Sequence, residues 1–153
     1  MSGASVATWG TAAAVAVPEL LTVATAFTQF AGIDLLATIA GGEGDRAALA
    51  AAAAGRVRIV DDDTWSDIFS KVLVEHVEPN LGQGRLTVLF EYPAPEAALA
   101  RAKSSDPRVA ERFEVYACGV ELANGFGELT DADEQRRRFA AAMDEKVRRY
   151  GER

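Results

Sequence analysis

Two carboxylates and one amide gather within eight residues late in the sequence, around a pair of glycines. The segment reads Glu121-Leu-Ala-Asn124-Gly-Phe-Gly-Glu128. Two carboxylates are what Mg²⁺ accepts when it also holds nucleotide phosphates. A carboxylate is equally the natural partner of a substrate ammonium group. The spacing leaves both chemistries open, and it makes Glu121, Asn124 and Glu128 candidate site residues.

The element that must position these residues is an antiparallel strand pair. Alternation of side-chain types predicts strands over residues 113–117 and 120–124, joined by a two-residue turn at Cys118-Gly119. Pairing across that turn places Tyr116 opposite Glu121 and Glu114 opposite Ala123. The polar face is expected to be exposed and to hold Arg112, Glu114, Tyr116 and Glu121, while Val115 and Leu122 are expected to face the core. A solvated sheet face is the ordinary explanation of such a pattern.

The position of Asn124 does not fit regular alternation, which would send its side chain to the core. The glycines that follow indicate a break or bulge near Gly125. Such a bulge would turn Asn124 and Glu128 towards the polar face. We therefore expect Glu121 and Glu128 to converge on one pocket beside Tyr116.

The remaining elements are predicted from caps, stop signals and periodicity. Helices are expected over 18–31 (stopped by Gly32), 45–54, from Thr64 onwards, over 95–102 and from Thr130 to Gly151, with a strand over 86–92. The order is helices first, then an antiparallel sheet, then a helix. This order predicts an α+β fold in which an antiparallel sheet has flanking helices.

Composition restricts the classes of function. The chain has 153 residues, a net charge of −7 and a pI near 4.8, which argues against a general nucleic-acid binder. The single cysteine, Cys118, allows no intramolecular disulfide and favours a reducing cytoplasm. The single histidine, His76, excludes a His-rich metal site, and we expect it to have a structural role.

The N-terminal residues need a separate interpretation. Residues 1–17 carry no charge and lack the positive region that precedes the apolar stretch of a secretory signal. The longer stretch up to Gly42 is too interrupted by polar residues for a transmembrane helix. We expect residues 1–17 to be an unstructured or non-native leader, with no membrane association.

Several stretches of the sequence resemble the class II lysyl-tRNA synthetase core. The resemblance is carried by Arg108–Tyr116, Gly119–Phe126, Glu128–Ala132 and Glu134-Gln135. Within this group, the sequence is more similar to the ligases that attach β-lysine to elongation factor P than to tRNA-charging enzymes. This similarity is judged from residues 27–34, 77–82, 92–94 and 97–100. The resemblance spans roughly Glu19–Arg149 and is firmest from Val88 to Phe139.

This resemblance implies a chemistry and a set of roles. ATP would activate lysine or β-lysine as an adenylate, which would pass to a lysine side chain of elongation factor P, with no covalent enzyme nucleophile. Glu121 and Leu122 would contact ATP, Asn124 and Glu128 would bind the amino acid, and Glu121 and Glu128 would hold Mg²⁺. A cytoplasmic homodimer is the expected state, and tRNA is an unlikely partner.

The sequence also departs from the family pattern. Gly127 stands where these ligases carry a bulkier residue, often His, which bears on substrate specificity. No counterpart of the family's upstream arginine-bearing strand-loop-strand, or of its downstream Gly-rich segment ending in arginine, occurs in the 153 residues. We therefore expect residues 18–153 to form a partial catalytic core. Two alternatives stay open: a fragment of a tRNA-charging lysyl enzyme, and a non-catalytic remnant or dimerisation module.

Overall fold

The computed structural model describes residues 16–151, so most of the predicted leader (1–17) lies outside the described part of the chain. Residues 16–18 lead into the first strand without regular structure. In chain order the elements are β1 (Glu19–Thr22), α1 (Val23–Ala26), η1 (Phe27–Ala31), η2 (Leu35–Thr38), β2 (Ile39–Ala40), β3 (Glu43–Gly44), α2 (Arg46–Ala53), α3 (Trp65–Val72), η3 (Leu73–Val77), η4 (Glu78–Asn80), β4 (Thr87–Pro93), η5 (Ala94–Glu96), β5 (Ala102–Lys103), β6 (Asp106–Ala117), β7 (Val120–Phe126) and α4 (Ala132–Tyr150).

The main sheet has the strand order β1-β4-β6-β5, and β7 also pairs with β6. The predicted α+β class is confirmed, but the sheet is not wholly antiparallel, because β1 pairs with β4 in parallel. The predicted helix over 18–31 is therefore wrong in its first part. Residues Glu19–Thr22 form a strand because they find a partner far along the chain, and only the continuation up to Gly32 is helical.

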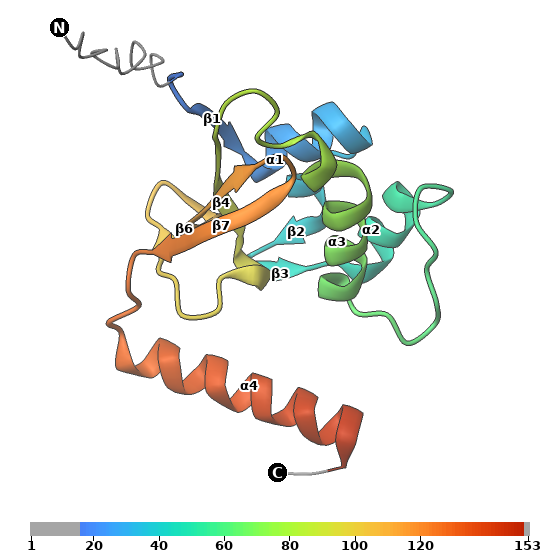
Figure 1. Ribbon diagram of the computed structural model, residues 1–153. Coiled ribbons are helices and arrows are strands. Elements are labelled where there is room, and N and C mark those ends of the chain that lie inside the picture. Colours follow the sequence, from blue (N-terminus) through green and yellow to red (C-terminus); the bar gives the residue numbers. More distant parts are fainter. Residues whose placement is uncertain (1–15, 152–153) are drawn as a thin grey trace, which may run out of the picture.

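Helices α1, α2 and α3 cover one face of this sheet (Figure 1). Helix α3 begins with the predicted Thr64 cap, and Asp67 completes a capping box. The ring of Phe69 stacks on the ring of Phe27, with centroids 5.0 Å apart, and on that of Trp65, with centroids 5.4 Å apart. The predicted helix over 45–54 is confirmed as α2, capped by Asp45. His76 lies at the edge of this layer, where its Nε2 is 3.0 Å from the Arg56 carbonyl.

The two faces of the β6–β7 hairpin are the reverse of the prediction. Tyr116 and Glu114, expected in solvent, face the helices and are only 1% and 5% exposed. The apolar face is the open one, since Phe113 is 41% and Val120 59% exposed. The polar side chains can be buried because they satisfy one another's hydrogen bonds, as described below.

The C-terminal part packs loosely. Helix α4 starts after the cap residue Asp131, one residue later than predicted, and ends at Gly151 in the left-handed conformation (φ 71°). No residue of α4 is buried, and most of the helix lies apart from the sheet (Figure 1). The predicted helix over 95–102 is wrong: a single 3₁₀ turn, η5, leads into β5. Among the described residues, none of the helices has the length and apolarity that a bilayer crossing requires.

Candidate functional site

The candidate residues lie on the β6–β7 hairpin, whose register contains one bulge. Tyr116 faces Glu121, as predicted. Leu122 is then the extra residue, so that Val115 pairs with Ala123 and Glu114 pairs with Asn124. The predicted pairing of Glu114 with Ala123 is therefore wrong, because the bulge comes before Asn124 and not near Gly125.

The bulge nevertheless brings Asn124 to the polar face. Its side-chain Nδ2 donates a hydrogen bond to Oε1 of Glu121, at 3.0 Å. Both side chains are exposed, because the helical layer that covers the inner half of this face does not extend over β7. Glu121 and Asn124 thus form an open polar pair next to the buried Tyr116.

A buried carboxylate, Glu114, lies beside this pair. Its Oε2 accepts hydrogen bonds from the hydroxyls of Tyr92 at 2.5 Å and Tyr116 at 2.7 Å, and its Oε1 accepts one from Arg112 at 2.7 Å. Burial raises the pKa of both phenols, and the hydrogen bonds to Glu114 raise it further. The sequence placed Glu114 on the right face but gave no sign of this network, whose members come from two strands.

Glu78 is a further carboxylate of this region. The Tyr116 hydroxyl lies 3.2 Å from its Oε1. Burial raises the pKa of Glu78, and the nearby charges of Glu114 and Glu121 also raise it, although the Tyr116 hydrogen bond lowers it. Glu78 is therefore close to both carboxylates. The only sequence signal for it was the resemblance over residues 77–82.

The segment that carries Glu78 is fixed to the hairpin turn by close backbone contacts. Cys118 N donates to the Gly82 carbonyl at 2.9 Å, and Gly119 N donates to the Leu81 carbonyl at 2.8 Å. Gly82 has a φ of +70°, and a Cβ there would lie 2.5 Å from the Ala117 Cα. Glycine is therefore required at 82 for the segment to approach β6.

Glu128 lies at the far end of this hairpin. Its backbone forms a bridge with Ala100, just beyond the end of β7. The Glu111 carbonyl accepts the Gly127 N–H at 2.7 Å. Tyr116 faces Glu121 and is five positions along β6 from Glu111. At about 3.3 Å per residue, this is about 17 Å along the strand. The structure therefore does not bring Glu121 and Glu128 together in one pocket beside Tyr116.

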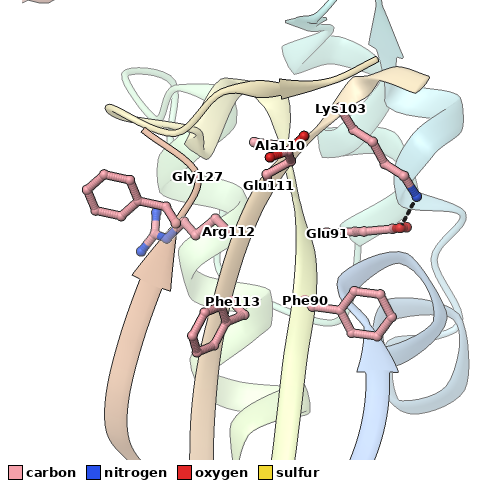
Figure 2. A pocket seen from close by; sticks show the side chains of 9 residues that line it. Phe90, Glu91, Lys103, Ala110, Glu111, Arg112, Phe113 and Gly127 are labelled. Atoms are coloured by element: carbon pink, nitrogen blue, oxygen red, sulfur yellow. Dashed lines mark hydrogen bonds and ion pairs between the residues drawn. The ribbon is translucent and has the colours of Figure 1, made fainter. Parts of the chain in front are cut away.

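A hollow lies elsewhere on the sheet. It is a groove of about 580 Å³ lined by Phe90, Glu91, Lys103, Ala110, Glu111, Arg112, Phe113, Phe126 and Gly127. Figure 2 shows the Lys103–Glu91 ion pair on one side of it, and Glu111 and Gly127 on the other. None of the candidate residues Glu121, Asn124 and Glu128 lines it. The candidate site is the open surface of β7 and not this groove.

A metal ion would find few protein ligands here. Across residues 16–151, no three His, Cys, Asp or Glu side chains gather into a metal site. Mg²⁺ that bridges nucleotide phosphates needs only one or two carboxylates. Glu114 and Glu121 lie on neighbouring strands of the hairpin, on either side of the bulge. This pair fits such an ion better than Glu121 with Glu128.

Comparison with known proteins places the chain in a family. The family model described as tRNA synthetases class II (D, K and N) matches residues 52–151. The elongation factor P--(R)-beta-lysine ligase of Pectobacterium atrosepticum is 44% identical over 125 residues, which are 79% of this chain and 36% of that protein. The ligase of the same name from Mannheimia succiniciproducens is 46% identical over 114 residues, 74% of this chain and 33% of that protein.

A shorter match has a higher identity. The elongation factor P--(R)-beta-lysine ligase of Histophilus somni is 60% identical over 79 residues, which are 52% of this chain and 24% of that protein. The chain spans about a third of the length of the first two relatives. Since the family model covers well over half of its residues, the chain belongs to the class II tRNA synthetase family (D, K and N), and its named relatives there are elongation factor P β-lysine ligases.

Proposed function

We propose that this chain carries part of the site at which an ATP-dependent ligase activates a lysine-type amino acid and transfers it to a lysine of elongation factor P. The names of the relatives support the substrate and the acceptor. The observation that carries the proposal is the contact between Glu121 and Asn124 on the polar face. These residues belong to the stretch for which the resemblance implies nucleotide and amino-acid binding.

The nucleotide end of the proposed site is formed by Glu121 and Leu122. Glu121 would hold Mg²⁺ at the ATP phosphates, and the hydrogen bond from Asn124 orients its carboxylate. Leu122, the extra residue of the bulge, would contact ATP with its backbone, because a bulge leaves such a residue outside the regular pairing. We propose Glu114 as the second metal carboxylate, since its Oε1 keeps a lone pair beyond the bond to Arg112.

The amino-acid end is formed by Asn124 and Glu128. The amide of Asn124 would position the bound amino acid, and the exposed carboxylate of Glu128 would receive an ammonium group of lysine or β-lysine. The length of strand between Glu121 and Glu128 favours this role for Glu128 over shared metal coordination. The site would extend along β7, with the phosphates at one end and the ammonium at the other.

The reaction needs positioning and charge stabilisation more than covalent help from the protein. An oxygen of the amino-acid carboxylate would attack the α-phosphorus of ATP, and the bond to pyrophosphate would break. The acceptor lysine amine would then attack the acyl carbon and release AMP. When bound, Mg²⁺ offsets the phosphate charge. Glu121 and Glu114 would hold the ion in place on a preformed sheet.

Calorimetric titration of the chain with ATP and Mg²⁺ tests the nucleotide end. We expect saturable binding that is lost in Glu121→Ala and retained in Glu75→Ala, a control that removes an exposed glutamate from η3. Exchange of labelled pyrophosphate into ATP, dependent on lysine or β-lysine, would show activation. Binding that survives Glu121→Ala unchanged would contradict the assignment.

Two other functions make different predictions. One is tRNA charging, because the family model includes tRNA-charging enzymes. If the chain is part of such an enzyme, it should support transfer of labelled lysine to tRNA and not to elongation factor P. A non-catalytic dimerisation module would bind no ATP and would sediment as a dimer. We propose the ligase reaction in a cytoplasmic homodimer, and comparing label transfer to the two acceptors in one assay separates the first two functions.

A further inference from the structure

Gly127, which departs from the family pattern, lies at a junction of three chain segments. Arg101 N donates to the Gly127 carbonyl at 2.8 Å, Gly127 N donates to the Glu111 carbonyl at 2.7 Å, and Glu111 N donates to the Arg101 carbonyl at 2.8 Å. The three hydrogen bonds form a closed ring. Beyond it, Leu129 N bonds the Leu99 carbonyl at 3.0 Å. The backbone of Glu128 is therefore held between two fixed points.

An ion pair occupies the space over this glycine. Nη2 of Arg101 lies 2.6 Å from Oε2 of Glu111. A Cβ at residue 127 would lie 2.5 Å from that same oxygen, 3.3 Å from the Glu111 Cβ and 3.5 Å from the Arg101 Nη2. A side chain at 127 would therefore require the Glu111 carboxylate to move from the position in which it pairs with Arg101. Figure 2 shows Gly127 and Glu111 side by side at the edge of the groove.

The direction of residue 127 corrects what the sequence suggested. A Cβ there would point at Glu111, which alternates with Arg112 and Glu114 along β6 and so lies on the opposite face from Glu114 and Asn124. Gly127 therefore does not contact a substrate on the polar face. Glu128, the next residue, lies beyond the end of β7 and is exposed. Residue 127 can affect specificity only through the backbone that carries Glu128.

We propose that the Arg101–Glu111 ion pair over Gly127 is a positioning element that sets where Glu128 meets the amino-acid substrate. This inference rests on the proposed role of Glu128. Arg101 and Glu111 are positioning residues, because they face away from the substrate side and act through the backbone ring. The pair is 56% and 38% exposed at its two side chains, so it contributes little to folding stability. Its effect is expected in local geometry.

Charge reversal tests this role without enlarging a buried side chain. Arg101→Glu and Glu111→Arg each place like charges over Gly127, and the double variant restores an ion pair. We expect each single variant to raise the dissociation constant of lysine or β-lysine about tenfold in the presence of Mg²⁺ and ATP, because a small displacement of a binding group has effects of this size. Binding of ATP itself should not change, and the double variant should recover amino-acid binding.

Two further variants complete the experiment. Gly127→Ala should behave like the single charge reversals, since its Cβ displaces the Glu111 carboxylate. Reversal of the Lys103–Glu91 pair, on the other side of the groove, is the matched control and should change nothing. Circular dichroism confirms folding, and if Gly127→Ala does not fold, the charge reversals decide.

The outcomes separate this inference from the function on which it rests. Amino-acid binding that is unchanged in both single variants, or that weakens together with ATP binding, would overturn the positioning role. Failure of the double variant to recover would also overturn it. If Glu128→Gln binds lysine and β-lysine as the unchanged chain does, the role of Glu128 itself is wrong, and the inference falls with it.

Discussion

The two strands of the β6–β7 hairpin differ in what they expose to solvent. Strand β6, the inner half, lies under the helical layer, whereas β7, the outer half, lies beyond it. On the inner half, Glu114 and Tyr116 are buried with Tyr92 of β4, and the guanidinium of Arg112 beside them is half-buried. On the outer half, Val120, Leu122 and Phe126 are 59%, 60% and 44% exposed. The difference shows that residue polarity does not decide which side of a sheet is inside. A polar set is buried when its members bond one another, and an apolar set stays open when no element covers it.

The largest effect on stability is expected in the helical layer, and α4 provides the contrast. Phe69→Ala removes a ring that is 2% exposed and stacks on both Phe27 and Trp65. We expect a loss of about 4 kcal/mol in the free energy of unfolding, from lost transfer energy and the cavity left behind. Phe139→Ala, at a side chain 59% exposed on α4, should cost less than about 1 kcal/mol. Urea titration followed by circular dichroism measures both, and equal losses would mean that α4 packs more closely than described.

The second contrast compares two carboxylates on the same face. Glu114→Ala leaves Arg112 and two phenols without their shared acceptor, and should cost about 3 kcal/mol. Glu121→Ala removes an exposed carboxylate and should change stability by less than about 0.5 kcal/mol, while removing the proposed nucleotide contact. Thermal unfolding of both variants without ligand measures the difference. A stable Glu114→Ala variant would show that the buried network is not needed for folding.

Local sequence signals predicted the parts of the fold that depend on neighbours in sequence. The Thr64 cap and the alanine-rich stretch over residues 45–54 predicted α3 and α2, and the turn at Cys118-Gly119 predicted the hairpin. Strand β1 was missed because its pairing with β4 joins residues far apart in sequence, and nothing local distinguishes Glu19–Thr22 from a first helical turn.

The candidate site was predicted in part for the same reason. Glu121 and Asn124 could be placed on one face because the glycines after Asn124 indicated a bulge, and the structure brings the two residues into contact. The neighbouring Glu78 and the donors around Glu114 come from separate elements, so their meeting depends on tertiary packing. Alternation grouped the β6 residues correctly into two faces but assigned the wrong face to the helices, since it contains no information about which face is covered.

Two glycines differ in the space that surrounds their backbone. Gly82 and Gly84 both have positive φ, +70° and +75°, but only Gly82 has backbone atoms in the way of a Cβ. Gly82→Ala should cost about 2 to 3 kcal/mol from conformational strain and from the contact with Ala117. Gly84→Ala should cost about 1 kcal/mol, from strain alone. Similar unfolding midpoints for the two variants would contradict the close approach of residues 78–82 to β6.

The smallest expected effect concerns the far end of α4, which Arg149 ties to the α3 cap at Asp67, 2.6 Å away. The hydrogen bond from Arg149 lowers the pKa of Asp67 to about 2 from its ordinary value of 3.8. A lowered folded-state pKa gives stability that is present above pH 3.8 and is lost as the pH falls towards 2. Solvent screening keeps this below about 1 kcal/mol. Arg149→Ala should reduce the fall in stability between pH 4 and 2, measured by thermal unfolding. If Arg149→Ala loses as much stability in acid as the unchanged chain, other carboxylates cause the loss.

The parallel pairing of β1 with β4 also has a kinetic consequence. Its ends, Glu19 and Thr87, are separated by 68 positions, and the whole helical layer lies between them. Closing so long a connection costs conformational entropy before the strand contacts reward it. The β4–β6–β7 meander, whose connections are shorter, should therefore assemble early in refolding, with the first strand joining the sheet last.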